Sequence, residues 1–517
     1  MTYLLQRMVL IIICFNWLSL ADLPVHCLRH QIVGDWEFYI GPSSTERSSC
    51  GHKQPDVESQ EPGEDRMLSD NTSTLRITLS NPNNVIMTTD STHRGTWTMV
   101  YDEGFETRID NRIFFAFSNF ELSRDAGGVK HNVSHCDRTL VGWYSAKNQS
   151  EFGCFYGRKT SPTVSFEEIE VKKMSPAYDQ PLGEDYHRSV VDKLNSREGT
   201  TWTAAIYPRL VGKSLREINK MSGIKRSSRP EDTPLEYLTR IERIRSRRRN
   251  RIELERTSLL DLEMLSAERT LPDSIDWRNM SGVNYLEPII DQGSCGSCYT
   301  VATMRMLSAR HKIKTRDLTA VPWSISFPLY CAEYNQGCDG GYAFLASKWS
   351  SDVGLLPATC AKYTPKDGKC ELTCDPSTIP KYKASNYHYV GGYYGGSSAA
   401  QIMKELVDGP LVLSLEPASD LIYYKSGVYK SKLQTNFTHV PEWERVDHAV
   451  LLVGYGEDKG QKYWLLQNSW GPDWGEDGYF RIARGYDDSG VESIAVAADV
   501  VKEHRPQDMF KSFVKIT

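Results

Sequence analysis

Three regions with different patterns of hydrophobic and polar residues follow one another along the chain. From Trp36 to about Met174, alternating or β-branched apolar runs are separated by Gly, Asn, Asp and Ser turns. Period-two alternation between turn residues is typical of half-buried strands. The runs are DWEFYI, TLRITL, NVIMTT, GTWTMVY, RIFFAF and TVSFEEIEV. We expect an antiparallel sandwich or barrel of about 130 residues in this region.

Charged stretches with helical periodicity follow, from about Ser175 to Thr270. Within them, Arg243 to Arg251 (RIRSRRRNR) holds six arginines in nine residues. Such a run is typical of a solvated helix face or a linker. It is equally typical of an exposed, protease-sensitive segment. Composition alone leaves both interpretations open.

The third region starts at Leu271 and is rich in Gly, Trp and Tyr. It opens with an apolar helical run after Cys298 (YTVATMRMLSARHKI) and closes with the strand-like segments AVLLVGYG, YWLLQNSW and GYFRIAR. Helix first and strands later favour an α+β fold with two segregated lobes and a cleft between them. A length of 517 residues likewise favours two or three separate cores. The net charge of −5 gives no reason to expect nucleic acid as a partner.

The first residues have the pattern of a secretory signal peptide. Arg7 precedes the apolar run from Met8 to Phe15, and Ser19 and Ala21 stand at positions −3 and −1 of a cleavage site. A single membrane anchor is the alternative, but this run is short for a bilayer and no later segment is longer. We therefore expect a mature chain that starts at Asp22 in an oxidising compartment. Five N-x-S/T sequons fit that route: Asn71, Asn132, Asn148, Asn279 and Asn436.

The cysteines are unevenly distributed and odd in number. Cys14 lies in the signal, so eleven of the 12 cysteines remain in the mature chain. Four fall before residue 155 and seven between Cys295 and Cys374. An odd cysteine in a secreted chain indicates a free, reactive thiol.

The segment QGSCGSCY, residues 292–299, supplies a candidate for that thiol. Its CGSCY core fits the signature around the nucleophilic cysteine of papain-like peptidases, here Cys298. A redox pair of Cys295 and Cys298 and a zinc site are the competing interpretations. Neither a second CxxC pair nor a short-spaced His-x-His follows, and an oxidising compartment favours disulfides over thiolate–zinc sites.

The nucleophile hypothesis predicts partners, and the sequence contains them. His448 (DHAVLLVGYG) lies 150 residues after Cys298, and Asn468 (QNSWGPDWG) 20 further on. A thiolate paired with an imidazolium at a helix N-terminus stays ionised in acid. Asn468 would fix the imidazole ring, and Trp470 would shield that bond from water. Gln292 would donate its amide N–H to the developing oxyanion, together with the backbone N–H of Cys298.

Residues 271–498 resemble the cathepsin C family, also called dipeptidyl peptidase I. The similar stretches include LPDSIDWRNM, QGSCGSCY, YHYVGGYYGG, DHAVLLVGYG, NSWGPDWGEDGYFRIARG and ESIAVAA. TWTAAIY (201–207) is similar to the family's activation peptide, and DLPVHCLRHQIVGDWEF (22–38) to the start of its N-terminal exclusion domain. The propeptide pattern of cathepsin L-type endopeptidases is not visible.

The resemblance implies a two-lobed papain-like catalytic domain, with a helical lobe and a β-barrel-like lobe, preceded by an antiparallel β-barrel exclusion domain. The implied parts are a signal peptide (1–21), the exclusion domain (22–157), an activation peptide (158–270), a catalytic heavy chain (271–434) and a light chain (435–517). The family is a homotetramer of protomers cut by an activating protease. A lysosomal or secreted enzyme without a membrane anchor is expected. The implied disulfides are Cys27–Cys136, Cys50–Cys154, Cys295–Cys338, Cys331–Cys370 and Cys360–Cys374, which leave Cys298 as the odd thiol.

The implied activity is removal of dipeptides from free N-termini of peptides and proteins. The exclusion domain would close the cleft, and the carboxylate of Asp22 would bind the substrate's ammonium. Two alternatives stay open. One is a papain-like endopeptidase with an accessory N-terminal domain, and the other is a non-catalytic binding or scaffold relative, against which the intact Cys298, His448 and Asn468 argue.

One position departs from the family pattern. The family binds a chloride through two tyrosine hydroxyls, one of which aligns with Tyr389, whereas the other falls on Phe344, which has no hydroxyl. Tyr342, two residues earlier, is the candidate substitute. The sequence therefore predicts chloride binding weaker than the family norm, and it predicts no metal site.

Overall fold

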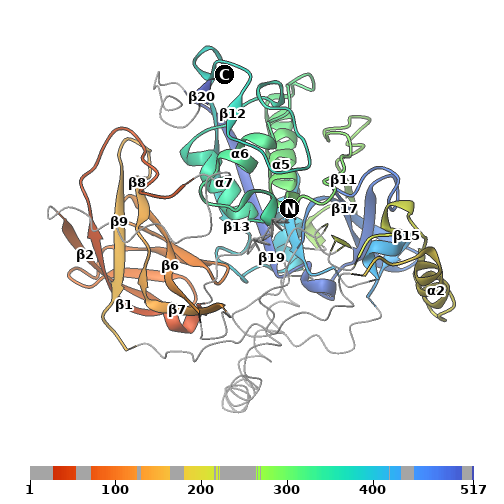
Figure 1. Ribbon diagram of the computed structural model, residues 1–517, viewed down its shortest axis with the longest axis horizontal. Helices are drawn as coiled ribbons and strands as arrows, with labels where there is room; N and C mark the ends of the chain where they lie inside the picture. The colour runs from red at the N-terminus through yellow and green to blue at the C-terminus, as the bar shows by residue number, and fades with distance from the viewer. Residues whose placement is uncertain are drawn as a thin grey trace, which may run out of the picture.

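The computed structural model describes residues 27–53, 72–124, 130–162, 180–214, 217–218, 221, 264, 266–267, 269–417, 420–431, 448–503 and 515–516. Asp22, the signal peptide, the arginine run and the segment TVSFEEIEV lie outside these residues. Two bodies stand side by side in Figure 1, a β-structure from the N-terminal third and a mixed helix and strand domain. A shorter segment, residues 180–214, lies on the far side of the second body.

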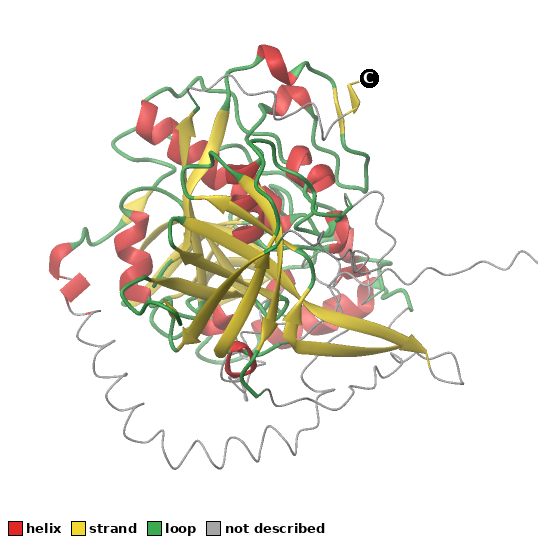
Figure 2. Cartoon of the chain, turned by 90° about the vertical axis from the view of Figure 1, so that its left-hand side faces the viewer, coloured by secondary structure: helices red, strands yellow, loops and turns green. Residues whose placement is uncertain are grey.

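The first body is an antiparallel barrel. Pairing of β9 with β1, and of β6 with β8, closes a ring of eight strands, and β7 adds to the outer half of the long strand β6. Figure 2 faces this barrel. The strands are β1 (Gly34–Ile40), β2 (Ser73–Ser80), β3 (Asn84–Met87), β4 (Arg94–Val100), β5 (Gly104–Ile109), β6 (Arg112–Arg124), β7 (Lys130–Thr139), β8 (Gly142–Ala146) and β9 (Phe152–Lys159), after the short helix α1 (Arg29–Ile32).

Alternation along these strands places large aromatic rings inside the barrel. Trp36, Phe38, Phe105, Phe114 and Phe155 are nearly inaccessible and contact one another, with ring centroids 4.8–6.5 Å apart. Burial of five such rings is a large share of this domain's hydrophobic stabilisation. The sequence pattern predicted an antiparallel sandwich or barrel, and the structure is a barrel.

The second body is α+β, as predicted. Its helices are α5 (Cys298–Thr315), α6 (Ser326–Cys331), α7 (Ala343–Asp352) and α8 (Ala399–Leu406). Its main sheet runs β10-β15-β18-β17-β16-β14-β19-β13, and β11 pairs with β16. The strands are β10 (Trp202–Ala204), β11 (Ile275–Asp276), β13 (Tyr382–Tyr389), β14 (Leu411–Leu415), β15 (Tyr424–Tyr429), β16 (His448–Asp458), β17 (Gln461–Gln467), β18 (Tyr479–Ala483) and β19 (Ile494–Lys502), with β12 (Glu371–Leu372) and β20 (Lys515–Ile516) paired separately.

Helix α5 is the central helix of this domain. Every residue from Cys298 to Arg310 is buried, including its few polar side chains. A helix enclosed on all sides is held by packing rather than by an amphipathic surface. Contacts with β14, β16 and β19 on one side and with α7 on the other fix its position between the two lobes.

Five disulfides brace the two bodies, and they are the pairs that the family resemblance implies. Cys298 is the free cysteine among the described residues, and it is buried. The bonds are Cys27–Cys136 and Cys50–Cys154 in the barrel, and Cys295–Cys338, Cys331–Cys370 and Cys360–Cys374 in the catalytic body.

The barrel docks on the second body through buried polar contacts. Tyr387 of β13 donates a hydrogen bond to Glu106 of β5 at 2.8 Å, and Arg47 pairs with Glu333. Breaking one partner of such a buried pair leaves an uncompensated charge, which penalises any other docking geometry. The barrel is therefore held in one position relative to α7 and β13.

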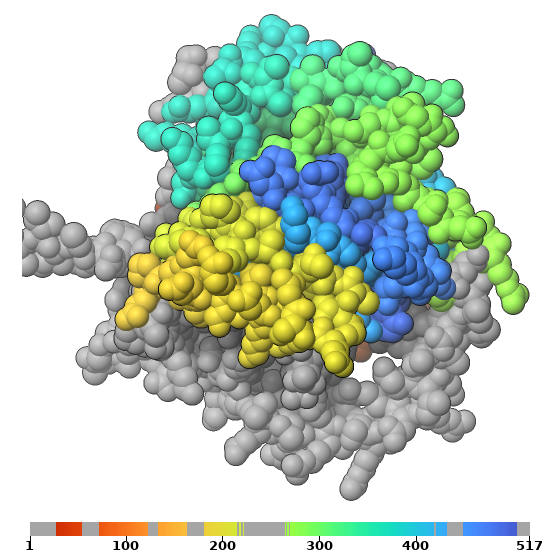
Figure 3. All heavy atoms as spheres, turned by 90° about the vertical axis from the view of Figure 1, so that its right-hand side faces the viewer, coloured from red at the N-terminus to blue at the C-terminus, as the bar shows by residue number. Residues whose placement is uncertain are grey.

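The segment from residue 180 to 214 covers the opposite edge of the sheet. It contains α2 (Glu184–Asn195), β10 and the short 3₁₀ helix η2 (Pro208–Leu210). Figure 3 shows this segment, in yellow, lying on the blue C-terminal part of the chain. Pairing of β10 with β15 and a hydrogen bond from the Tyr207 hydroxyl to the Tyr424 carbonyl, 2.6 Å long, attach it. Within the described part of the chain, no helix is long and apolar enough to span a membrane.

Candidate active site

Cys298 is the first residue of α5, where the helix dipole favours negative charge. Its sulfur lies next to β16, because the backbone N–H of Ala449 donates to Sγ at 3.4 Å. Cys298 is 3% exposed. A thiolate at a helix N-terminus with a backbone donor beside it is stabilised relative to an ordinary thiol.

His448 begins β16, and Asn468 directly follows the neighbouring strand β17. The imidazole Nε2 and the amide Oδ1 of Asn468 lie 2.8 Å apart. Since the amide oxygen can only accept, Nε2 carries a proton and donates it. This bond fixes the ring orientation and reserves Nδ1 for proton exchange with a reacting group.

Trp470 covers the imidazole as the sequence predicted. Its ring stacks on that of His448 with a centroid distance of 4.8 Å and an interplanar angle of 23°. The indole is 1% exposed. The hydrogen bond between His448 and Asn468 therefore lies in a water-poor environment, where it is stronger than in water.

Gln292 is held by three hydrogen bonds in the loop before α5. Its backbone N–H donates to the Ser469 carbonyl, its Oε1 accepts from the Ser469 hydroxyl, and its Nε2 donates to the Cys295 carbonyl at 3.0 Å. An amide nitrogen has a second hydrogen, and the first backbone N–H of a helix has no intrahelical acceptor. The side chain of Gln292 and the backbone of Cys298 can thus donate to one oxyanion.

The structure therefore brings Cys298, His448, Asn468 and Gln292 together from three separate parts of the sequence. Other predicted positions lie apart or outside the description. Asn148 and Asn279 are exposed in turns. Asp22, Asn71, Asn436 and the side chain of Asn132 lie outside the described residues.

Comparison with known proteins agrees with this geometry. Residues 271–499 match the model of papain family cysteine proteases, and residues 22–159 match that of the cathepsin C exclusion domain. Cathepsin C of Schistosoma mansoni is 30% identical, over 97% of this chain and 100% of that protein.

The chain belongs to the cathepsin C family of papain-like cysteine proteases. Dipeptidyl aminopeptidase 1 of Plasmodium falciparum (isolate 3D7) is 23% identical, over 95% of both chains. Among solved structures, a digestive procathepsin L2 proteinase from the Tenebrio molitor larval midgut is similar at 24% identity, with a TM-score of 0.46, over 61% of this chain and 90% of that one.

A turn of the exclusion barrel also lies near the site, and the sequence analysis did not predict it. Residues 101–103 connect β4 and β5 and reach the catalytic domain. The Tyr101 hydroxyl lies 3.2 Å from the Ser414 hydroxyl, and Ser414 pairs with Ala449, whose N–H contacts the Cys298 sulfur. Burial raises the pKa of the Tyr101 phenol, and the nearby Cys298 and Glu103 raise it further against the hydrogen bond from Ser414. No local signal in the sequence marks this turn, because its role depends on how the two domains dock.

The segment that resembles the family's activation peptide contacts the other side of the site. Arg209 donates to the Trp470 carbonyl and faces Asp291, which precedes Gln292. The Trp470 indole in turn donates to the Met221 carbonyl at 2.9 Å. The tryptophan that covers His448 is thus itself covered by this segment.

At the position where the family resemblance implies a chloride, one of the two tyrosines is replaced by Phe344, and the hydroxyl of the candidate substitute Tyr342 is bonded to the barrel. Phe344 stacks on Tyr389 with centroids 4.5 Å apart, and the Tyr342 hydroxyl donates to Glu103 at 3.0 Å instead of pointing to an anion. The pKa of Tyr389 is raised well above its usual value, first by burial and then by Tyr101, Glu106 and Glu103, against an opposing effect of Arg29.

Proposed function

We propose that this cysteine protease is a dipeptidyl peptidase, which removes two residues at a time from free N-termini. The observation that carries the proposal is the barrel turn 101–103 beside the nucleophile. Three successive contacts, through Tyr101, Ser414 and Ala449, link the barrel to the sulfur of Cys298. An endopeptidase needs a cleft open at both ends, whereas a barrel turn that closes one end of the cleft would limit the acyl part of the substrate to a short peptide.

The chemistry follows from the four residues of the site. The Cys298 thiolate attacks the carbonyl carbon of the substrate's second residue, and Gln292 Nε2 and the Cys298 N–H hold the oxyanion. The imidazolium of His448 gives its proton to the leaving amine as the peptide bond breaks. Water then attacks the thioester, with His448 accepting its proton, and the dipeptide leaves with a new carboxylate.

A substrate bound in this way places its ammonium in a confined cleft, where it loses hydration. A paired carboxylate must compensate for that loss. The candidate is Asp22 at the N-terminus of the mature chain, which the signal cleavage site after Ala21 creates. A homotetramer of processed protomers, an activating protease and a lysosomal or secreted location are further parts of this proposal, supported by the membership of the family.

The test combines Asp22→Ala with acylation of the substrate. The substitution is expected to lower kcat/KM for dipeptidyl substrates. The loss of transition-state stabilisation should be roughly 2–4 kcal/mol, the cost of unpairing a buried charge. Acylating the substrate's amine should lower kcat/KM of the wild type by a similar factor. It should lower kcat/KM of the Asp22→Ala variant little further. Normal cleavage by Asp22→Ala, or a mature chain that starts elsewhere, would rule out Asp22 as the group that binds the substrate's ammonium.

A further inference from the structure

Ser297 stands directly before the nucleophile, at the N-cap position of α5, and has no accessible surface. A serine at this position commonly accepts a hydrogen bond from the N–H of the second or third helical residue. Ser297 makes no such bond, and its φ of -95° and ψ of 9° differ from the extended backbone of an ordinary N-cap. Its hydroxyl lies 2.7 Å from the hydroxyl of Tyr363 instead. The first turn of α5 thus begins without a side-chain cap.

Tyr363 belongs to the loop of residues 360–374, which is anchored in two ways. One disulfide closes this loop on itself, and a second attaches it to the last residue of α6. The hydroxyl of Tyr330, also on α6, lies 3.0 Å from the carbonyl oxygens of Thr364 and Lys366. Burial raises the pKa of Tyr363 to about 12, so its phenol stays protonated. The loop therefore presents a neutral hydroxyl to Ser297 from a fixed position.

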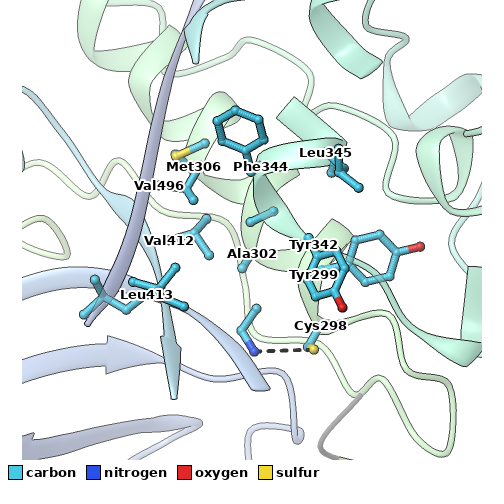
Figure 4. Packing of buried hydrophobic residues seen from close by; sticks show 14 of the residues in the cluster. Cys298, Tyr299, Ala302, Met306, Tyr342, Phe344, Leu345, Val412, Leu413 and Val496 are labelled. Carbon is cyan, nitrogen blue, oxygen red and sulfur yellow. Dashed lines mark hydrogen bonds between the residues drawn. The ribbon is translucent and has the colours of Figure 1, made fainter. Parts of the chain in front are cut away.

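The uncapped turn matters because Cys298 is its first residue. The first N–H groups of a helix have no intrahelical acceptor and carry the positive end of the helix dipole. Figure 4 shows the Cys298 sulfur at this end of the helix, with the N–H of Ala449 directed at it. A serine hydroxyl turned toward the helix would accept from one of these N–H groups and bring its oxygen lone pairs near the thiolate. Both effects would disfavour negative charge at Cys298.

We propose that Tyr363 is a positioning residue for the nucleophile: it binds the Ser297 hydroxyl and so keeps the first turn of α5 free to stabilise the Cys298 thiolate. Tyr363 acts through Ser297 and not by touching substrate. The disulfide-bonded loop then supports catalysis in addition to bracing the fold. This inference concerns the chemistry common to papain-like proteases, so it does not depend on the proposed dipeptidyl activity.

Other titratable groups lie near the Cys298 sulfur, and they are the same in every variant compared below. They are the imidazole at the start of β16, one phenol from the barrel and one from α5, and carboxylates near these phenols and near Tyr363. Burial raises the pKa of both phenols above the ordinary 10. The groups are His448, Tyr101, Tyr299, Glu103, Asp291, Asp339 and Asp367. A difference between variants therefore reports the surroundings that Ser297 and Tyr363 create.

The experiment compares the processed enzyme with Tyr363→Phe, Ser297→Ala, their combination and Tyr330→Phe. Its main readout is the pH dependence of Cys298 alkylation by iodoacetamide, which titrates the thiolate without a peptide substrate. Tyr363→Phe is expected to raise the midpoint of this titration by about half to one pH unit, the scale of a helix-dipole effect, and to lower kcat/KM about three- to tenfold. Ser297→Ala lacks the hydroxyl that would cap the helix, so its shift should be clearly smaller. Adding Tyr363→Phe to Ser297→Ala should shift the midpoint no further.

Tyr330→Phe is the matched control. It deletes a tyrosine hydroxyl bonded to the same loop, but it leaves the hydroxyls of Ser297 and Tyr363 in contact. Its Tm should fall about as much as that of Tyr363→Phe, because both changes remove hydrogen bonds that hold the loop. The alkylation midpoint and kcat/KM of Tyr330→Phe should stay at the wild-type values.

Three results would overturn the assignment. Equal shifts for Tyr363→Phe and Ser297→Ala would show that the lost hydrogen bond acts only by loosening the loop. A shift of the same size for Tyr330→Phe would lead to the same conclusion. An unchanged midpoint for Tyr363→Phe, which keeps the ring and is the mildest change, would remove Tyr363 from the positioning of the nucleophile. If Ser297→Ala fails to fold, Ser297→Gly also lacks the hydroxyl and replaces it in each comparison.

Discussion

At the scale of single residues, the account depends on Cys298 being the sole nucleophile. Its position at the start of α5 beside Ala449 and its free thiol set it apart from the ten bonded cysteines. Cys298→Ser should abolish peptidase activity and leave folding and secretion intact, because a serine hydroxyl of ordinary pKa is not ionised by the same partners. One alkylating equivalent should inactivate the wild type and label Cys298. Appreciable turnover by the serine variant, or labelling confined to another cysteine, would contradict the assignment.

A second prediction at this scale concerns chloride. Phe344 removes a hydroxyl donor that is typically worth about 1.5–3 kcal/mol toward a charged acceptor. The Tyr342 hydroxyl is the candidate substitute for the missing donor, but it already donates a hydrogen bond to Glu103. Activity should therefore change little when chloride is replaced by a non-binding anion at constant ionic strength. A sharp requirement for low-millimolar chloride would contradict this prediction.

At the scale of elements, α2 contains a buried histidine that makes the attachment of its segment depend on pH. His187 is fully buried, its Nε2 donates to the Leu210 carbonyl at 3.1 Å, and its Nδ1 lies 2.8 Å from the Tyr423 hydroxyl. Burial lowers its pKa below the ordinary 6.5, although the bond to Leu210 partly opposes this. The detached segment therefore binds a proton before the docked one, so docking is strongest above pH 6.5 and weakens as pH falls below it.

Limited proteolysis of the Cys298→Ser precursor by an added protease checks this pH dependence. Cleavage within residues 180–214 should accelerate from about pH 7 to about pH 5, the range in which a detached imidazole gains its proton. His187→Asn has no titrating ring and should flatten the profile. The same pH profile in both proteins would assign the effect to other groups. The assays need a protease whose own activity is constant over that range.

The elements near the site were largely predictable from the sequence. The apolar run after Cys298 is long enough for a helix, and the short apolar segments around His448 and Asn468 are rich in β-branched and aromatic residues; they form α5, β16 and β17. The position of Tyr101 was not predictable. Its contact with Ser414 joins residues 313 apart in sequence, and Tyr101 adopts a positive φ of 51° that local propensity disfavours. The contact of Arg209 with Trp470 is likewise a product of docking, which no local pattern encodes.

At the scale of the whole molecule, we expect the segment that lies over Trp470 to be removed when the precursor is processed. We expect two cuts between about Gly157 and Leu271, a heavy chain that begins at or near Leu271, and a further cut between Leu433 and Val440. The reason is the polar, arginine-rich composition of that region, which is typical of protease-sensitive chain. N-terminal sequencing of the active form measures this. A fully active single chain that retains Arg247 to Arg249 would contradict it.

The central claim is that the exclusion barrel makes a papain-like protease into a dipeptidyl peptidase. The most direct measurement is to digest one unblocked peptide and its N-acetylated copy with the processed enzyme and to sequence every product over time. The account predicts successive dipeptides from the unblocked N-terminus and an intact acetylated peptide. Internal fragments from both peptides at similar rates would show that the cleft is open past Tyr101 and would contradict the account.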